Sequence, residues 1–137
     1  MPTAAFKLLK DNGLLINNND ADPYTRYVYN NTIDMPTSSA LVNNGGTTDI
    51  KNNIGPNTAN NMATSAAYYV NAANHDYHLV SGSAPVDKGV TVSGVTVDFD
   101  GNPRPSGSAF DIGAFEFQGA QVKPAAPTGL HIVGTGP

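Results

Sequence analysis

The sequence has no cysteine and no tryptophan, and only 13% of its 137 residues are charged. Without cysteine the chain forms no disulfide, offers no thiol nucleophile and cannot ligate zinc through sulfur. Seven Lys and Arg against eleven Asp and Glu give a net charge of −4. Binding to phosphates needs clustered basic residues, so nucleic acid is excluded as an expected partner.

Long apolar runs are also missing. No stretch approaches the roughly 20 apolar residues of a membrane-spanning helix, so no membrane span is expected. The first residues, MPTAAFKLLKDNG, lack the charged and apolar regions of a signal peptide. Helical periodicity is limited to two short candidates, residues 4–10 and residues 58–69, because Gly, Asn, Thr and Pro interrupt the rest.

Short strand-like runs fill the first half of the chain, and each is followed by Asn or Gly, which tolerate the left-handed backbone of a tight turn. VYNNTI at 28–33 and IKNNI at 50–54 align with a spacing of 22 residues, which places one Asn-Asn pair upon the other. LLINNN at 14–19 is similar, but its distance from the next copy, at 28–33, is shorter than a full period. This pattern is typical of a β-solenoid, in which corner residues stack from coil to coil.

Asparagine suits such a corner because its amide donates and accepts hydrogen bonds at once. A column of stacked Asn side chains can therefore bond along the solenoid axis. The alternative is that the Asn-Asn pairs only mark polar loops. The stacked arrangement is the one we expect.

Residues 76–118 carry several spaced motifs, DYHLVSGSAPVDKGV followed by DFDGNPRPSGSAFDIGAFEFQ. In this order they resemble the C-terminal segment of secreted bacterial right-handed parallel β-helix proteins of the pectate-lyase-like superfamily, a part often described as a choice-of-anchor domain. One departure is Ala84-Pro85, where the family more usually has Pro before Ala. Because Pro fixes its own φ and restricts the preceding residue, the turn at 83–87 is expected to differ locally.

The resemblance implies an all-β fold, a right-handed parallel β-helix (single-stranded solenoid), of which the chain holds the last coils plus a C-terminal cap. Residues 1–75 would form terminal coils, and 76–118 the last strands and the cap. Residues 119–137 would form a linker and the start of a domain that resembles fibronectin type III. The expected parent is a longer bacterial protein, secreted or at the cell surface, whose flanking domains are partners of this piece.

The acid-rich stretch 98–117 is the first candidate for chemistry. Calcium is one interpretation, because hard cations take clustered carboxylate oxygens. However, the Gly of DFDGN comes fourth rather than sixth as in an EF-hand loop, and Ala109 stands where the bidentate Glu belongs. No cofactor is therefore evident, and calcium stays as the alternative. The charged residues of the stretch are Asp98, Asp100, Arg104, Asp111 and Glu116.

A structural cap is the interpretation we favour for these five residues. The open end of a solenoid exposes strand edges and an apolar cross-section, which the Phe residues of the stretch would cover. Arg104 would bridge Asp111 or Glu116 and hold the loop over the end. Asp98 and Asp100 suit Asx-turns around Gly101.

The catalytic residues are unknown from this sequence, which contains no recognisable hydrolase motif. A polysaccharide lyase needs a base beside the sugar and a cation for the uronate carboxylate, and Arg26 and Lys51 are the candidates. Tyr27 and Tyr29 share a strand face and suit stacking on a sugar. Solvated surface charges and aromatic packing between coils are the respective alternatives.

His75 and His78 lie three residues apart. On a helix that spacing suits a metal, but on a strand it places the two side chains on opposite faces. We therefore expect solvated or packed histidines and no metal site.

Taken with the resemblance, these features predict the C-terminal part of an extracellular polysaccharide-active protein, lyase-like or hydrolase-like. Its partner would be a polysaccharide, including uronate-containing ones. This piece would be mainly structural and inactive alone. The alternatives are a non-catalytic carbohydrate-binding or adhesive cell-surface β-helix protein, and a pure cap and spacer.

Overall fold

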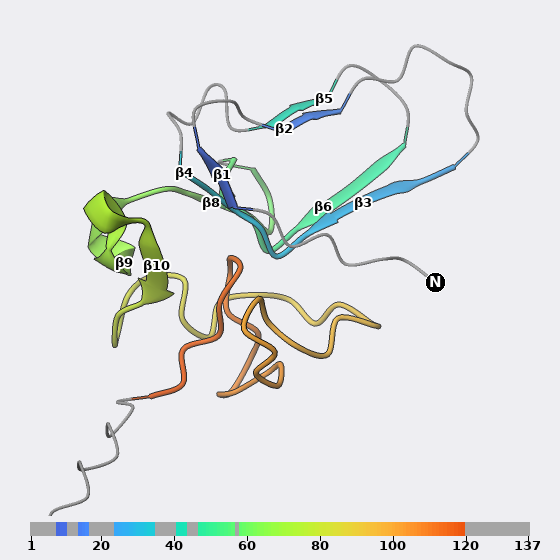
Figure 1. Ribbon diagram of the computed structural model, residues 1–137. Coiled ribbons are helices and arrows are strands. Elements are labelled where there is room, and N and C mark those ends of the chain that lie inside the picture. The colour runs from blue at the N-terminus through green and yellow to red at the C-terminus, as the bar shows by residue number, and fades with distance from the viewer. Residues whose placement is uncertain are drawn as a thin grey trace, which may run out of the picture.

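The computed structural model describes residues 8–10, 14–16, 24–34, 41–43, 47–56 and 58–119. These residues form short strands and two single turns of 3-10 helix, with no α-helix among them (Figure 1). None of them belongs to a helix long and apolar enough to cross a membrane. The elements are β1 (Leu8–Lys10), β2 (Leu14–Ile16), β3 (Arg26–Tyr29), β4 (Thr32–Asp34), β5 (Leu41–Asn43), β6 (Thr48–Lys51), β7 (Ile54–Gly55), β8 (Met62–Ala63), η1 (Ala66–Tyr68), β9 (Tyr69–Asn71), η2 (Ala72–Asn74) and β10 (Asp76–Leu79).

The all-β class is thus correct, but both helix candidates are wrong where the structure describes them. Residues 8–10 of the first candidate are strand β1, which pairs with β4. In the second candidate, residues 58–69, β8 is followed by the single turn η1, in which the N–H of Ala67 donates to the Ser65 hydroxyl. Strand pairing over long sequence distances outweighs the weak local helix propensity.

Parallel pairing organises the first half of the described chain. One sheet has the order β1-β4-β7-β8, and β2-β5 and β3-β6 form two further parallel pairs. Arg26 lies opposite Thr48 and Thr32 lies opposite Ile54, so the pairing follows the 22-residue spacing found in the sequence. In Figure 1 the three sheets lie on three different sides, and the chain turns a corner between one sheet and the next.

A column of asparagines links these strands, and we call it the Asn stack: Asn31, Asn53 and Asn61. The amide nitrogen of Asn31 donates to Oδ1 of Asn53 over 2.7 Å, and that of Asn53 donates to Oδ1 of Asn61 over 2.8 Å. The predicted stacking of Asn31 on Asn53 is confirmed. Asn61 extends the stack after only eight residues, and the copy at 17–19 lies outside the described residues.

The residue before each member of the Asn stack turns the corner. Asn30, Asn52 and Asn60 have φ values of 53°, 56° and 61°, in the left-handed region. Asn adopts this conformation more readily than other side chains that have a Cβ. In each Asn-Asn pair, the first residue therefore makes the turn and the second makes the stack.

The second half of the described chain, residues 64–119, packs against the parallel strands, and we call it the C-terminal lobe. It contains the antiparallel pair β9-β10 and long loops. Its core combines lobe residues with one residue of β7 (Ile54, Tyr69, Tyr77, Leu79, Ile112, Ala114 and Phe115).

Contacts between the C-terminal lobe and the parallel strands reach two successive strands of one sheet. The backbone N–H of Ala114 donates to Oγ1 of Thr32 on β4 over 3.1 Å, and Gly113 packs on Ile54 of β7. The Tyr77 hydroxyl adds a 2.7 Å bond to Asp34. The lobe therefore lies along the flank of this sheet (Figure 1).

Candidate functional site

The charged residues of the stretch 98–117 gather around a buried ion pair. The side chains of Arg104 and Glu116 are both 0% exposed, and their closest N–O distance is 2.5 Å. Glu116 also accepts the N–H groups of Asp111 and Ser106, while Arg104 donates to the carbonyls of Asp111 and Gly113. A buried ion pair needs such additional bonds, because removing two charges from water is costly. Of the two predicted partners of Arg104, Glu116 provides the carboxylate and Asp111 a backbone carbonyl.

Asp98 holds the DFDGN loop in place. One of its oxygens accepts the N–H groups of Asp100 and Asn102, at 2.9 and 2.8 Å. The other accepts the side-chain amide of Asn102 and the N–H of Glu116, at 3.1 and 3.0 Å. The Asx-turn expected at Asp98 is therefore present, with Gly101 at a φ of 86°. Its carboxylate oxygens have partners within the protein.

Asp111 joins this network to the turn that contains the Ala84-Pro85 departure. Its carboxylate accepts the N–H groups of Asp87 and Phe117, and the Pro85 carbonyl accepts the N–H of Ile112. Burial raises the pKa of Asp111, although these hydrogen bonds act in the opposite direction. Burial likewise lowers the pKa of Arg104, against the attraction of Glu116. We call Asp98, Arg104, Asp111 and Glu116 the buried charge network; its role as an end cap stays a prediction.

The four residues predicted to bind sugar all lie on β3 and β6, so the structure brings them together. Tyr27 is 44% exposed, whereas Tyr29 is only 6% exposed. The Lys51 ammonium lies 2.7 Å from Asp49, which also accepts the Tyr29 hydroxyl over 2.6 Å. Hydrogen bonds from Lys51 and Tyr29 lower the pKa of Asp49. Lys51 is thus a paired cation, and Tyr27, beside Arg26 on β3, offers the exposed ring.

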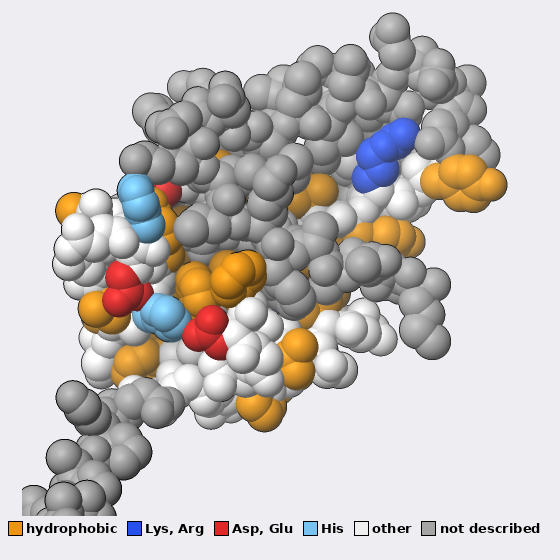
Figure 2. Space-filling view, viewed as in Figure 1, with side chains coloured by type: hydrophobic (Ala, Val, Ile, Leu, Met, Phe, Trp, Pro, Cys, Tyr) orange, Lys and Arg blue, Asp and Glu red, His pale blue; other side chains and the backbone are white. Residues whose placement is uncertain are grey.

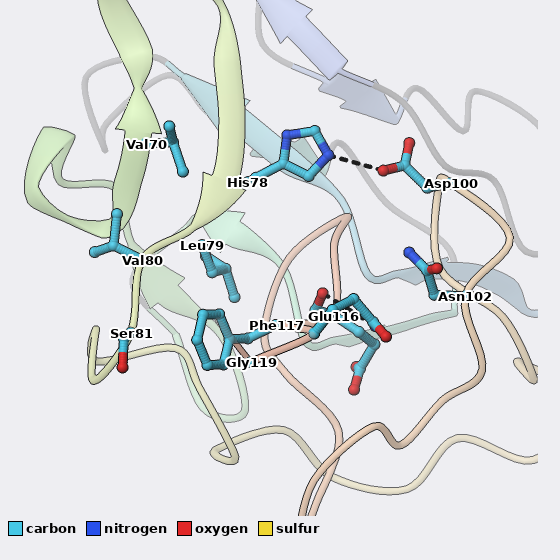
Figure 3. A pocket seen from close by; sticks show the side chains of 11 residues that line it. Val70, His78, Leu79, Val80, Ser81, Asp100, Asn102, Glu116, Phe117 and Gly119 are labelled. Carbon is cyan, nitrogen blue, oxygen red and sulfur yellow. Dashed lines mark hydrogen bonds and ion pairs between the residues drawn. The ribbon is translucent and has the colours of Figure 1, made fainter. Parts of the chain in front are cut away.

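A cluster that the sequence did not reveal lies on the C-terminal lobe, and we call it the acid–histidine cluster: Asp76, His78 and Asp100. The imidazole Nδ1 of His78 lies 2.6 Å from Asp76. Its Nε2 lies 2.8 Å from Asp100 (Figure 3). The ring packs on Phe115, with 4.3 Å between ring centroids. Partial burial alone would lower the pKa of His78. The hydrogen bonds to Asp100 and Asp76 outweigh this effect and raise that pKa.

The sequence predicted an Asx-turn for the side chain of Asp100, but this side chain pairs with His78. This geometry also limits the chemistry of His78. A general base needs a free ring nitrogen facing the group it deprotonates, and both nitrogens of His78 face carboxylates. Ser81, which lies nearby, is thus not part of a Ser-His-Asp triad. His75 instead stacks on Tyr77, with an interplanar angle of 11°. Among the described residues, no group of three His, Asp or Glu is placed to hold a metal ion.

A cavity of about 600 Å³ opens beside the acid–histidine cluster. Figure 3 shows it between β9-β10 on one side and the Asp100 loop and the end of the described chain on the other. Only the fold brings these three segments together, so no local motif signalled the cavity. Its lining residues are Val70, His78, Leu79, Val80, Ser81, Asp100, Asn102, Glu116, Phe117, Gln118 and Gly119.

Comparison with known proteins gives no relative. No protein-family model, curated protein or solved structure matches the chain.

Proposed function

We propose that the chain is the C-terminal part of an extracellular bacterial right-handed parallel β-helix protein that acts on polysaccharides. Its own task is mainly structural: it ends the coils and stabilises them. The observation that carries this proposal is the Asn stack within parallel strands that pair at 22-residue spacing. The resemblance of residues 76–118 supplies the class of parent protein.

The strand pairing supports the β-helix part of the proposal. A parallel pair needs a crossover connection, and here the connections from β1 to β4, from β2 to β5, from β3 to β6 and from β4 to β7 each contribute strands to the other two sheets before the chain returns. Crossovers between parallel strands of one sheet are almost always right-handed. Residues 24–56 then correspond to a coil and the beginning of the next.

The buried charge network supports the structural role of the C-terminal lobe. Its acids accept hydrogen bonds from the backbone of the lobe itself, and its one arginine is fully buried. Catalytic carboxylates need access to a substrate, whereas Asp98, Asp111 and Glu116 are at most 3% exposed. The network therefore serves to fix the loops that pack against β4 and β7.

Polysaccharide degradation by the full-length parent tests the functional proposal. The parent would be incubated with alginate, pectin and glycosaminoglycans, and both unsaturated products and new reducing ends would be measured. We expect products from the parent and none from residues 1–137 alone. Absence of products from the parent on every substrate would overturn the enzymatic part, and turnover by residues 1–137 would overturn the structural role.

A second candidate function is non-catalytic carbohydrate binding by the β3-β6 surface. It is favoured by the 44% exposed ring of Tyr27, which lies opposite Asp49 in the β3-β6 pair, because an exposed aromatic ring is suited to stacking on a sugar. Affinity electrophoresis in polysaccharide gels would measure it. Retardation should be lost in Tyr27→Ala and kept in Phe99→Ala, which removes a ring of similar exposure from the C-terminal lobe. Equal retardation of both variants would refute this role for Tyr27.

A further inference from the structure

We propose that the cavity beside the acid–histidine cluster binds a small phenolic ring, uncharged or cationic, through its apolar walls and the carboxylate of Asp100. This site is separate from the β3-β6 surface and does not depend on the polysaccharide activity of the parent.

The walls of the cavity suit a flat apolar ring. Val70 of β9, Leu79 of β10 and Phe117 line the cavity (Figure 3). The volume of about 600 Å³ lies within the range of small-molecule sites. Val70 is 57% exposed although it is a large hydrophobic residue on a strand. A ring in the cavity would remove such apolar surface from water, which is favourable in proportion to the area covered.

Asp100 is the acceptor for a donor group on the ligand. His78 holds one of its carboxylate oxygens over 2.8 Å, and the other takes no hydrogen bond from any described residue. The second acid of the lining, Glu116, is already committed to Arg104 and to the backbone N–H of Asp111. A hydroxyl or ammonium group would therefore bond to Asp100, which His78 holds at the edge of the cavity.

Charge decides between classes of ligand. Among the described residues, the lining contains two acids and one histidine and no Lys or Arg. The charge of Glu116 is balanced by Arg104, and His78 balances only one of its two acidic neighbours. Figure 2 shows acidic and histidine side chains close together on this face, with the visible Lys and Arg side chains far from them. An anionic ligand would be repelled, and a cationic one attracted.

The same geometry leaves the site without a catalytic base. Both ring nitrogens of His78 are engaged by carboxylates, so no base stands ready to activate Ser81. The site binds its ligand and releases it unchanged.

Three probes with one phenol ring and different charge test the proposal: p-cresol, tyramine and 4-hydroxyphenylacetate. Each would be titrated into ¹⁵N-labelled protein while the amide resonances are followed. We expect p-cresol and tyramine to shift the amides of residues 78–81 and 116–119, with tyramine bound more tightly. The anionic probe should produce little or no shift at the same concentration.

Variants make the site assignment specific. Ser81 is exposed and lines the cavity, so Ser81→Trp should fill it and abolish the shifts. Ser93→Trp places the same ring at an exposed turn outside the cavity and should leave them unchanged. Val70→Ser removes apolar surface from the cavity wall at a second exposed position and should weaken binding. This variant tests the site if the tryptophan variant misfolds. Asp100→Asn should reduce the advantage of tyramine over p-cresol.

The proposal is overturned if none of the three probes shifts these amides, or if the anion binds as well as tyramine. It is also overturned if the shifts persist in both Ser81→Trp and Val70→Ser, or fall on β3 and β6 instead. Methyl glucoside serves as a fourth probe, and binding of this sugar in preference to p-cresol would refute the phenolic assignment.

Discussion

Asp98 and Asp100 show how the surroundings of one residue type decide its role. Asp98 is buried and accepts four hydrogen bonds, whereas Asp100 is exposed and pairs with His78. The role of Asp98 could be predicted, because an Asx-turn depends on neighbouring residues and on Gly101. The pairing of Asp100 joins two segments 22 residues apart without any repeated motif. The acid–histidine cluster could therefore not be predicted.

Removing the buried cation tests the buried charge network. Arg104→Ala leaves Glu116 charged in a fully buried position, and breaking a buried pair in this way costs about 3–5 kcal/mol. We expect a loss of this size in the free energy of unfolding, measured by urea denaturation. Lys88→Ala, which removes an exposed cation from the same lobe, should change it by less than about 0.5 kcal/mol. Similar losses in the two variants would argue against a special role for Arg104.

The acid–histidine cluster should make stability depend on pH. Hydrogen bonding to its acids raises the folded pKa of His78 above its unfolded value of about 6.5. The stability that His78 contributes is therefore full below about pH 6.5 and is lost as pH rises through the folded pKa. At the acidic end, the folded pKa of Asp76 is lowered, chiefly by its hydrogen bond with His78, so its contribution disappears as pH falls through that value.

His78→Gln measures this dependence. The wild type should exceed the variant in stability most in mildly acidic buffer, by up to about 1 kcal/mol because the pairs are half exposed. The difference should shrink at alkaline pH. A difference that grows with rising pH would contradict the proposed ion pairs, and melting curves across pH would measure it.

Among the secondary-structure elements, the strands followed by Asn-Asn pairs were the ones whose pairing the sequence could predict. A spacing of 22 residues predicted which strands pair and that Asn31 stacks on Asn53, because identical corner residues of parallel strands lie side by side. The third pair, at Asn60 and Asn61, was missed because only eight residues separate its stacked member from Asn53. The chain turns back after β7 so that β8 pairs with it, and Asn61 thereby stacks on Asn53 as a residue 22 positions away would.

Interrupting the Asn stack should destabilise the parallel strands. Asn53 binds both neighbours in the stack and the carbonyls of Val28 and Lys51. Asn53→Ala leaves several buried donors and acceptors unpaired, and each costs about 1–3 kcal/mol. We expect the free energy of unfolding to fall by at least about 2 kcal/mol. Asn74→Ala, at an exposed position in η2, is the control and should stay close to the wild type.

At the scale of the whole molecule, the C-terminal lobe and the parallel strands form one packed unit. Asn30 and Asn52, which turn the corners of the strands, also donate their side-chain amides to carbonyls of the lobe. Gly113 lies close to Thr32 and Ile54, on two successive strands. The motif resemblance predicted residues 76–118 as a unit, but the contacts with individual strands depend on three-dimensional packing that local patterns do not encode.

Gly113→Ala tests this packing against a matched control. An added Cβ would lie 2.8 Å from Ile54 and 3.0 Å from Thr32, whereas at Gly94 it would meet nothing within 4 Å. Both glycines have positive φ, at 110° and 88°, so the two alanine variants share the backbone strain. Overpacking should make Gly113→Ala less stable than Gly94→Ala by about 1–3 kcal/mol. Equal melting temperatures would show that the lobe does not pack closely on these strands.

Strands 22 residues apart pair in parallel and stack their asparagines. The most direct measurement is a nuclear Overhauser spectrum of labelled protein, read between β3 and β6 and between the side-chain amides of Asn31 and Asn53. We expect cross-peaks that match Arg26 with Thr48 and Tyr29 with Lys51, as parallel strands require, together with amide contacts along the Asn stack. Antiparallel cross-peaks between these strands, or none across the 22-residue interval, would contradict this pairing.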